Sequence, residues 1–214
     1  MSKYDLVIWD WNGTLLSDVD VNVRTINILL HKRGISQIPS REAYLERFRF
    51  PVIDYYRELG FNTDVENFSD IANDYINVYN VEARDAGLYD GTREVLEAVR
   101  DMGVRQAIVS AADGDRLRCE VKNRGIDGYF TDIIGKGDNR GDGKIALGQG
   151  FVNSTGVPAS KILFVGDMEH DAELAAACGC DCLLIARGHM SCERLEKLGV
   201  PVVDDISDVI GYIG

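Results

Sequence analysis

The sequence predicts an α/β fold, in which a three-layer core with a parallel sheet carries an inserted helical subdomain. Short apolar runs alternate with longer amphipathic stretches in residues 90–214, a pattern typical of parallel strands covered by helices on both faces. Residues 16–89 break this alternation and read as helices, over a length too great for an ordinary strand-to-helix connection. We therefore expect a core formed by residues 1–15 and 90–214 and a helical subdomain formed by residues 16–89.

The expected strands are short segments of continuous apolar character, which indicates burial on both faces of the sheet. They span 5–9, 106–109, 132–134, 162–165 and 183–185. The expected helices follow the helical period, and in the first core helix Val95, Leu96 and Val99 form one apolar face. The core helices span 92–102, 113–124, 144–155 and 169–178, and those of the insert 18–33, 41–48, 52–59 and 64–86.

The composition argues against several classes of function. The net charge of -12 disfavours nucleic acids and anionic membranes as partners, because both select faces rich in Lys and Arg. No window approaches the roughly 18 apolar residues of a membrane span. The N-terminal apolar run is too short for a signal peptide, so we expect a cytoplasmic protein. The odd count of 5 cysteines then argues against a disulfide framework. The oligomeric state stays open.

The first expected strand ends at the most informative motif of the chain, Asp-Trp-Asn-Gly-Thr-Leu, which begins at Asp10. A carboxylate there lies at the carboxyl edge of the sheet, where open α/β folds gather their ligands. Two other strands end in polar residues: Ser110 follows one, and the Gly166-Asp167 pair follows another. Asp171 would lie one helical turn after Asp167 on the same side. Paired carboxylates suit a hard cation with oxygen ligands.

These motifs, in this order around a helical insert, resemble those of the haloacid dehalogenase-like (HAD) hydrolases. The resemblance covers nearly the whole chain and is greatest to the phosphoglycolate phosphatase-like branch with a helical C1-type cap. It implies a Rossmann-like core, with residues 16–89 as the cap, and a small phosphorylated metabolite as substrate.

The resemblance also assigns roles to individual residues. Asp10 would attack phosphorus and form an aspartyl-phosphate. Ser110 would bind the transferring phosphoryl group, and Lys144 would neutralise its charge. The expected ligands of Mg²⁺ are Asp10, the backbone carbonyl of Asn12, Asp167 and Asp171. Taken alone, Ser110 could be a helix N-cap, and Lys136 competes with Lys144 for the lysine role.

Asn12 departs from the family pattern, because most of these phosphatases carry a second Asp there as the general acid and base. An amide has no titratable proton near neutral pH, and acid–base catalysis is typically worth about 10²–10⁴-fold. We therefore expect slow turnover of alkyl phosphates, with aryl or acyl phosphates affected less. One alternative is a non-catalytic phosphate or metabolite sensor. Another is a phosphonatase, for which Lys32 is the cap lysine, or a dehalogenase, which would not need the Asp167 motif.

Several other residues invite functional readings. Arg47 and Arg49 alternate with aromatic residues in the insert and could bind a second anionic group of the substrate. The alternative is a solvated helix end with the aromatic residues packed inside. His170 could relay protons or could be a partly exposed residue of the first helical turn, whereas His189 shows no partner pattern.

The segment 138–143 begins like a calcium loop, but its third position is Arg140. We expect a loop that leads to Lys144.

Overall fold

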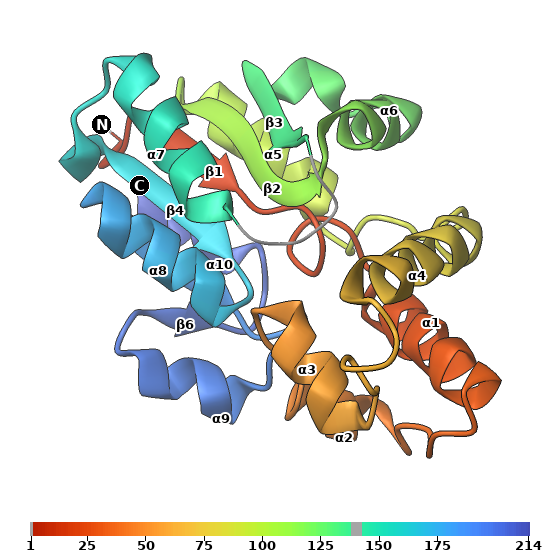
Figure 1. Ribbon diagram of the computed structural model, residues 1–214. Coiled ribbons are helices and arrows are strands. Elements are labelled where there is room, and N and C mark those ends of the chain that lie inside the picture. The colour runs from red at the N-terminus through yellow and green to blue at the C-terminus, as the bar shows by residue number, and fades with distance from the viewer. Residues whose placement is uncertain (1, 138–142) are drawn as a thin grey trace.

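The computed structural model describes residues 2–137 and 143–214, so most of the loop expected over 138–143 lies outside the described residues. The described chain forms a six-stranded sheet in the order β3-β2-β1-β4-β5-β6 (Figure 1). All five pairings between neighbouring strands are parallel, which confirms the expected α/β fold. The strands are β1 (Leu6–Trp9), β2 (Arg105–Asp113), β3 (Asp132–Lys136), β4 (Ile162–Gly166), β5 (Asp181–Ile185) and β6 (Val202–Val203).

Helices cover both faces of the sheet because its strands are apolar on both sides. Leu6 and Ile8 of β1 pack into one hydrophobic cluster with α7 and α8, whereas Val7 and Trp9 pack into another with α5, α6 and α10. Figure 1 shows the same layers, with α7 and α8 in front of the sheet. The core helices are α5 (Thr92–Asp101), α6 (Gly114–Asn123), α7 (Lys144–Thr155), α8 (Glu169–Cys178), α9 (Cys192–Leu195) and α10 (Asp208–Ile213).

The segment between β1 and α5 is helical and has a hydrophobic cluster of its own. Its helices are α1 (Val19–Lys32), α2 (Arg41–Leu45), α3 (Val52–Leu59) and α4 (Phe68–Glu82). They lie together beside the core in Figure 1. The helix expected over 64–86 is shorter in the structure, because Asn67 caps it by accepting a hydrogen bond from the backbone N–H of Ser69.

The α2 part of the insert is held against the C-terminal part of the core. The guanidinium of Arg194 in α9 donates to the carbonyls of Leu45 at 2.7 Å and Phe48 at 2.9 Å. Arg41 donates in the opposite direction, to the carbonyl of Arg187 at 3.2 Å. These bonds hold the first residue of α2 against the loop that follows β5, and the last residue of α2 against α9.

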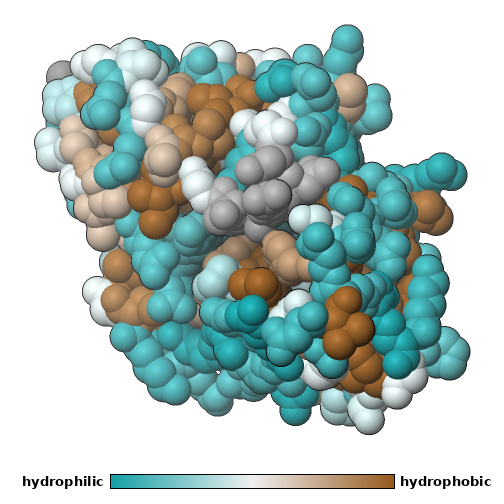
Figure 2. Space-filling view, viewed as in Figure 1, coloured by the Kyte–Doolittle hydropathy of each residue, from teal (hydrophilic) through white to brown (hydrophobic). Residues whose placement is uncertain are grey.

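The surface is hydrophilic over much of the face in Figure 2, and hydrophobic residues gather over α7 and α8. In the described part of the chain, no helix has the length and apolar character needed to cross a membrane. The five cysteines are free thiols.

Candidate active site

The sheet reverses its strand order beside β1, which lies between β2 and β4. Such a switch point opens a crevice at the carboxyl ends of the strands, where ligands bind in open α/β folds. The backbone N–H of Asp10 donates to the carbonyl of Val165 at 2.8 Å, so the ends of β1 and β4 are in register. This register brings Asp10 and Asp167 to the same point of the crevice.

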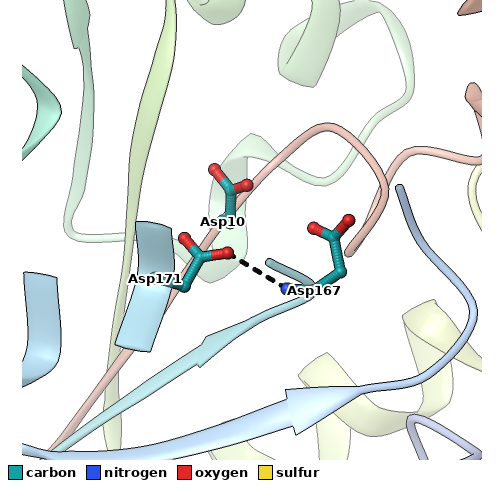
Figure 3. A group of neighbouring side chains, drawn as sticks. All are labelled: Asp10, Asp167 and Asp171. Atoms are coloured by element: carbon teal, nitrogen blue, oxygen red, sulfur yellow. Dashed lines mark hydrogen bonds between the residues drawn. The ribbon is translucent and has the colours of Figure 1, made fainter. Parts of the chain in front are cut away.

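Three carboxylates meet at this point, those of Asp10, Asp167 and Asp171 (Figure 3). Each offers one oxygen, and these oxygens all lie within 4.8 Å of one another. The backbone N–H groups of Asp167 and Met168 both donate to Oδ2 of Asp171 at 3.1 Å, which fixes that carboxylate at the start of α8. The cluster could hold a metal ion through oxygen ligands alone.

Lys144, the first residue of α7, supplies a positive charge to the cluster. Its Nζ lies 2.7 Å from Oδ1 of Asp10 and 2.6 Å from Oδ1 of Asp171, and the side chain is almost fully buried. Lys144 thus lies beside the expected nucleophile, and its role toward a phosphoryl group stays a prediction. Lys136 is also buried, at the end of β3.

The cluster carries more negative charge than Lys144 balances. Burial raises the pKa of Asp10 to about 6, although Lys144 acts in the opposite direction. Burial likewise raises the pKa of Asp167 to about 7, against the opposing effect of His189. Three carboxylates beside one ammonium leave a surplus of two formal charges, which a divalent cation would balance. The donor set therefore fits a hard divalent ion.

The side chain of Asp167 is oriented by neighbouring donors. Thr14 donates its hydroxyl to Oδ1 at 2.8 Å, and the backbone N–H of His189 donates to Oδ2 at 2.7 Å. Gly13 makes the turn that permits this approach: its φ is +74°, and a Cβ there would overlap Asp167 and His189. The Gly-Thr turn after Asp10 therefore positions Asp167 as well as Asp10.

The side chain of Asn12 belongs to a buried hydrogen-bond network rather than pointing freely into the crevice. Its Nδ2 donates to Oδ2 of Asp18 at 2.8 Å and to the hydroxyl of Tyr79 at 2.9 Å. Tyr79, which comes from α4 of the insert, donates to the same Asp18 oxygen at 2.7 Å. The metal-ligand role of the Asn12 backbone carbonyl stays a prediction.

Asp18 and His189 form a buried pair, which the sequence analysis missed. Oδ1 of Asp18 lies 3.2 Å from Nε2 of His189, and Nδ1 of His189 lies 3.0 Å from the hydroxyl of Tyr44 in α2. Burial favours the neutral form of both groups. Each nevertheless holds its partner charged: the pKa of Asp18 is lowered and that of His189 is raised. Locally, Asp18 reads as a helix N-cap, so only the tertiary structure identifies the pair.

Ser110 lies near the end of β2 and is buried. Its hydroxyl accepts a hydrogen bond from the backbone N–H of Ala112 at 3.1 Å. The residue lines the same cavity as Asp10 and Lys144. Its proposed contact with a phosphoryl oxygen stays a prediction.

Arg47 and Arg49 of the insert lie outside the lining of the main cavity. Arg47 is exposed, and Arg49 forms an ion pair with Glu58 and lines a smaller second cavity. Among the described residues, the arginine that lines the main cavity is Arg116 in α6. A substrate-binding role for Arg47 and Arg49 stays a prediction. His170 also lines the main cavity, and its ring is stacked on Phe50 with centroids 5.1 Å apart.

Comparison with known proteins identifies the family. A model of the haloacid dehalogenase-like hydrolase family matches residues 7–185. The chain therefore belongs to this family, as its motifs indicate. It is a hydrolase by family, and it is similar to phosphatases.

The individual relatives are distant. A phosphoglycolate phosphatase of Pseudomonas savastanoi pv. phaseolicola is 26% identical over 215 residues, which cover 96% of this chain and 78% of that protein. The tyrosine-protein kinase PtkA of Mycobacterium tuberculosis is 24% identical over 219 residues, which cover 96% of this chain and 72% of PtkA. A haloacid dehalogenase-like hydrolase from Streptococcus pneumoniae matches with a TM-score of 0.84 at 16% identity, covering 98% of each chain. At this identity the structural match shows the fold alone.

Proposed function

We propose that this protein is a Mg²⁺-dependent phosphatase that hydrolyses small phosphorylated metabolites through an aspartyl-phosphate on Asp10. The observation that carries the proposal is the buried cluster of Asp10, Asp167 and Asp171 around the amine of Lys144. The similarity to phosphoglycolate phosphatases supports it.

Mg²⁺ would be held by Asp10, Asp167, Asp171 and the backbone carbonyl of Asn12. When bound, the ion supplies positive charge that reduces the repulsion between a carboxylate nucleophile and a phosphate dianion. Lys144 already lies beside Asp10, so its charge would act in the same direction.

The reaction begins when a carboxylate oxygen of Asp10 attacks phosphorus. The bond between phosphorus and the ester oxygen breaks, and the leaving group departs with the electron pair. Water then attacks phosphorus, which releases inorganic phosphate and restores the Asp10 carboxylate. Ser110 would hold a phosphoryl oxygen during both steps, while Lys144 stabilises the charge on the group in transfer.

Residues 16–89 would act as the cap over this site. Tyr44, Tyr55 and Tyr79 from the insert line the same cavity as Asp10. The insert would thus exclude water from the reacting phosphate and select the leaving group. A phosphonatase-type Schiff base is disfavoured, because Lys32 is exposed at the end of α1.

Phosphate release from acetyl phosphate and 2-phosphoglycolate, with MgCl₂ and with excess EDTA, tests the proposal. We expect hydrolysis only with Mg²⁺. Asp10→Asn should reduce it by at least about 10³-fold, as expected for loss of a covalent nucleophile. Asp5→Asn is the matched control, because Asp5 is exposed just before β1 and should keep full activity. Binding of phosphate without any release from acetyl phosphate would instead identify a sensor.

A further inference from the structure

The cavity that contains Asp10, Ser110 and Lys144 extends into the insert and becomes aromatic there. Its volume is about 170 Å³. The aromatic residues that line it all come from the insert: Tyr44, Phe48, Phe50, Tyr55, Tyr56, Phe68, Tyr75 and Tyr79. The remaining insert residues of the lining are the apolar Ile26, Val52, Ala72 and Ile76 and the polar Asp18 and Asn22, which are hydrogen-bonded to each other. An apolar chamber therefore adjoins the carboxylate cluster.

The volume of about 170 Å³ covers the whole cavity, including the space beside Asp10 where the phosphoryl group would bind, so the chamber has room for at most one aromatic ring. An apolar cavity of about 150 Å³ engineered in another protein stays dry and binds benzene. Aromatic side chains favour a further ring in edge-on or offset geometry, and the lining already shows such contacts, as between Phe48 and Tyr55 at 88°.

Most polar groups of the chamber are already engaged with the protein. The hydroxyl of Tyr44 is bonded to His189, and that of Tyr79 to Asp18. Arg116 donates to Oδ1 of Asn80 at 2.6 Å and forms an ion pair with Glu120 at 3.5 Å. Among the described residues, Nε of Arg116 and Nε2 of His170 are buried without a hydrogen-bond partner. A polyhydroxylated leaving group would lose more hydrogen bonds to water than these few free atoms can replace, which is unfavourable. A carboxylated one would meet at Arg116 a charge that Glu120 already balances.

Tyr55 is the exception among these hydroxyls. It is 1% exposed, and in the described part of the chain its hydroxyl has no hydrogen-bond partner. A buried hydroxyl without a hydrogen-bond partner is unfavourable unless a ligand forms a hydrogen bond with it. A single polar substituent on a bound ring would do so.

Asn12 also favours an aromatic leaving group, namely a phenol. Its amide cannot protonate an oxygen that departs from phosphorus. A phenol has a pKa near that of tyrosine, about 10, whereas the pKa of water is about 15.7 and that of a simple alcohol is similar. A phenolate can therefore leave with its electron pair and take up a proton from water afterwards, while an alkoxide needs protonation as the bond breaks.

On the basis of the proposed function, we propose that the substrate is an aryl phosphate monoester whose single ring occupies the aromatic chamber. Asp10 attacks phosphorus, the bond from phosphorus to the phenolic oxygen breaks, and the phenolate accepts a proton from water. Water then hydrolyses the aspartyl-phosphate.

Three esters separate the two parts of the proposal in assays of the full chain with MgCl₂. Benzyl phosphate and 2-phosphoglycolate both release primary alcohols, but only the former carries a ring. Phenyl phosphate and benzyl phosphate both carry a ring, but only the former releases a phenol. We expect kcat/KM for benzyl phosphate to exceed that for 2-phosphoglycolate at least tenfold. We also expect kcat for phenyl phosphate to exceed that for benzyl phosphate at least tenfold.

A variant that fills the chamber provides the structural test. Ala72→Phe places a ring in the lining from α4, so the ratio of KM for phenyl phosphate to KM for methyl phosphate should rise at least tenfold. Val81→Phe, on the exposed side of the same helix, should leave that ratio unchanged. Thermal unfolding of both variants checks that they fold. If Ala72→Phe does not fold, competition by phenylphosphonate against the wild-type enzyme gives the same information, because tight binding relative to methylphosphonate requires the chamber.

The outcomes distinguish this inference from the proposed function. Hydrolysis of acetyl phosphate with a preference for 2-phosphoglycolate over benzyl phosphate would overturn the aryl assignment alone. No hydrolysis of any ester, acetyl phosphate included, would overturn the phosphatase proposal itself.

Discussion

Asp18 and His189 are 171 residues apart in the chain, yet their side chains form a buried pair with Oδ1 and Nε2 3.2 Å apart. Asp18 lies where the insert begins, and His189 lies in the loop after β5. The same His189 holds Asp167 through its backbone N–H. One residue thus links the carboxylate cluster to the start of the insert.

Separating this pair should destabilise the protein strongly. Asp18→Asn leaves a buried imidazolium without its carboxylate, and loss of one partner of a buried pair costs about 3–5 kcal/mol. Urea unfolding of Asp18→Asn, His189→Gln and the double variant measures the coupling. Glu97→Gln, which breaks an exposed pair with Arg100, is the control and should cost less than about 1 kcal/mol. Additive effects of the two buried substitutions would contradict the pairing.

Asn12→Asp should speed the hydrolysis of alkyl phosphates. It restores a titratable carboxyl group, and general acid–base catalysis is worth about 10²–10⁴-fold, so kcat on benzyl phosphate should rise at least about tenfold. The gain on phenyl phosphate should be smaller, because a phenolate needs less protonation.

The structure adds a condition to this prediction. The amide of Asn12 donates to Asp18, so the single variant places two carboxylates in contact. Asn12→Asp combined with Asp18→Asn restores an amide opposite a carboxylate and is the second variant to assay, after thermal unfolding has shown that it stays folded despite the loss of the Asp18–His189 pair. No gain on benzyl phosphate in either variant would show that position 12 does not limit turnover.

Thr14→Val should weaken metal binding without removing a ligand. It deletes the hydroxyl that donates to Oδ1 of Asp167 at 2.8 Å. Loss of a hydrogen bond to a metal ligand typically lowers metal affinity about 10–100-fold. Titration with MgCl₂ measures the effect, and Thr14→Ser, which keeps the hydroxyl, is the matched control. Equal affinities in the two variants would contradict the orienting role.

The metal-free protein should lose stability as the pH rises from about 4 to about 7. The pKa of Asp10 is raised from 3.8 to about 6 and that of Asp167 from 3.8 to about 7, mainly by burial. The folded state then binds more protons than the unfolded state within this window, so stability falls with pH. The raised pKa of His189 also lowers stability with rising pH, but only from about pH 6.5 upward, whereas the lowered pKa of Asp18 acts below about pH 3.8.

Melting temperatures measured in EDTA and in MgCl₂ across this pH range test the prediction. Mg²⁺ should raise the melting temperature more at about pH 8 than at about pH 5, because the ion binds the deprotonated carboxylates. Asp10→Asn should flatten the pH dependence in EDTA. A shift by Mg²⁺ that is the same at both pH values would contradict the assignment of these groups as ligands.

The sequence is sufficient to predict those strands and motifs that depend on neighbouring residues of the chain. Strands such as Leu6–Trp9 are continuous apolar runs, and the residues at their carboxyl ends must meet because parallel strands share one edge. The Asp10 and Asp167 motifs are therefore identifiable from the sequence alone. The segments β6, α9 and α10 were missed, because a two-residue strand and two short helices carry too little periodicity to detect.

The contacts between distant segments could not be predicted. Tyr44, Tyr79 and His189 converge only through the packing of the insert on the core, and no local pattern marks them. The same holds for Arg116, which lines the cavity from the core although the sequence directed attention to Arg47 and Arg49.

The bonds from Arg194 to the carbonyls of Leu45 and Phe48 have a consequence for how substrate would enter. Any swing that lifts α2 off the core must break both of them together with the Tyr44–His189 contact. The α4 side is bonded to the core as well, through Arg116, which donates to Asn80, and through Asn12, which donates to the hydroxyl of Tyr79. The insert is thus held to the core along both edges, and an opening motion must break hydrogen bonds on whichever edge it lifts.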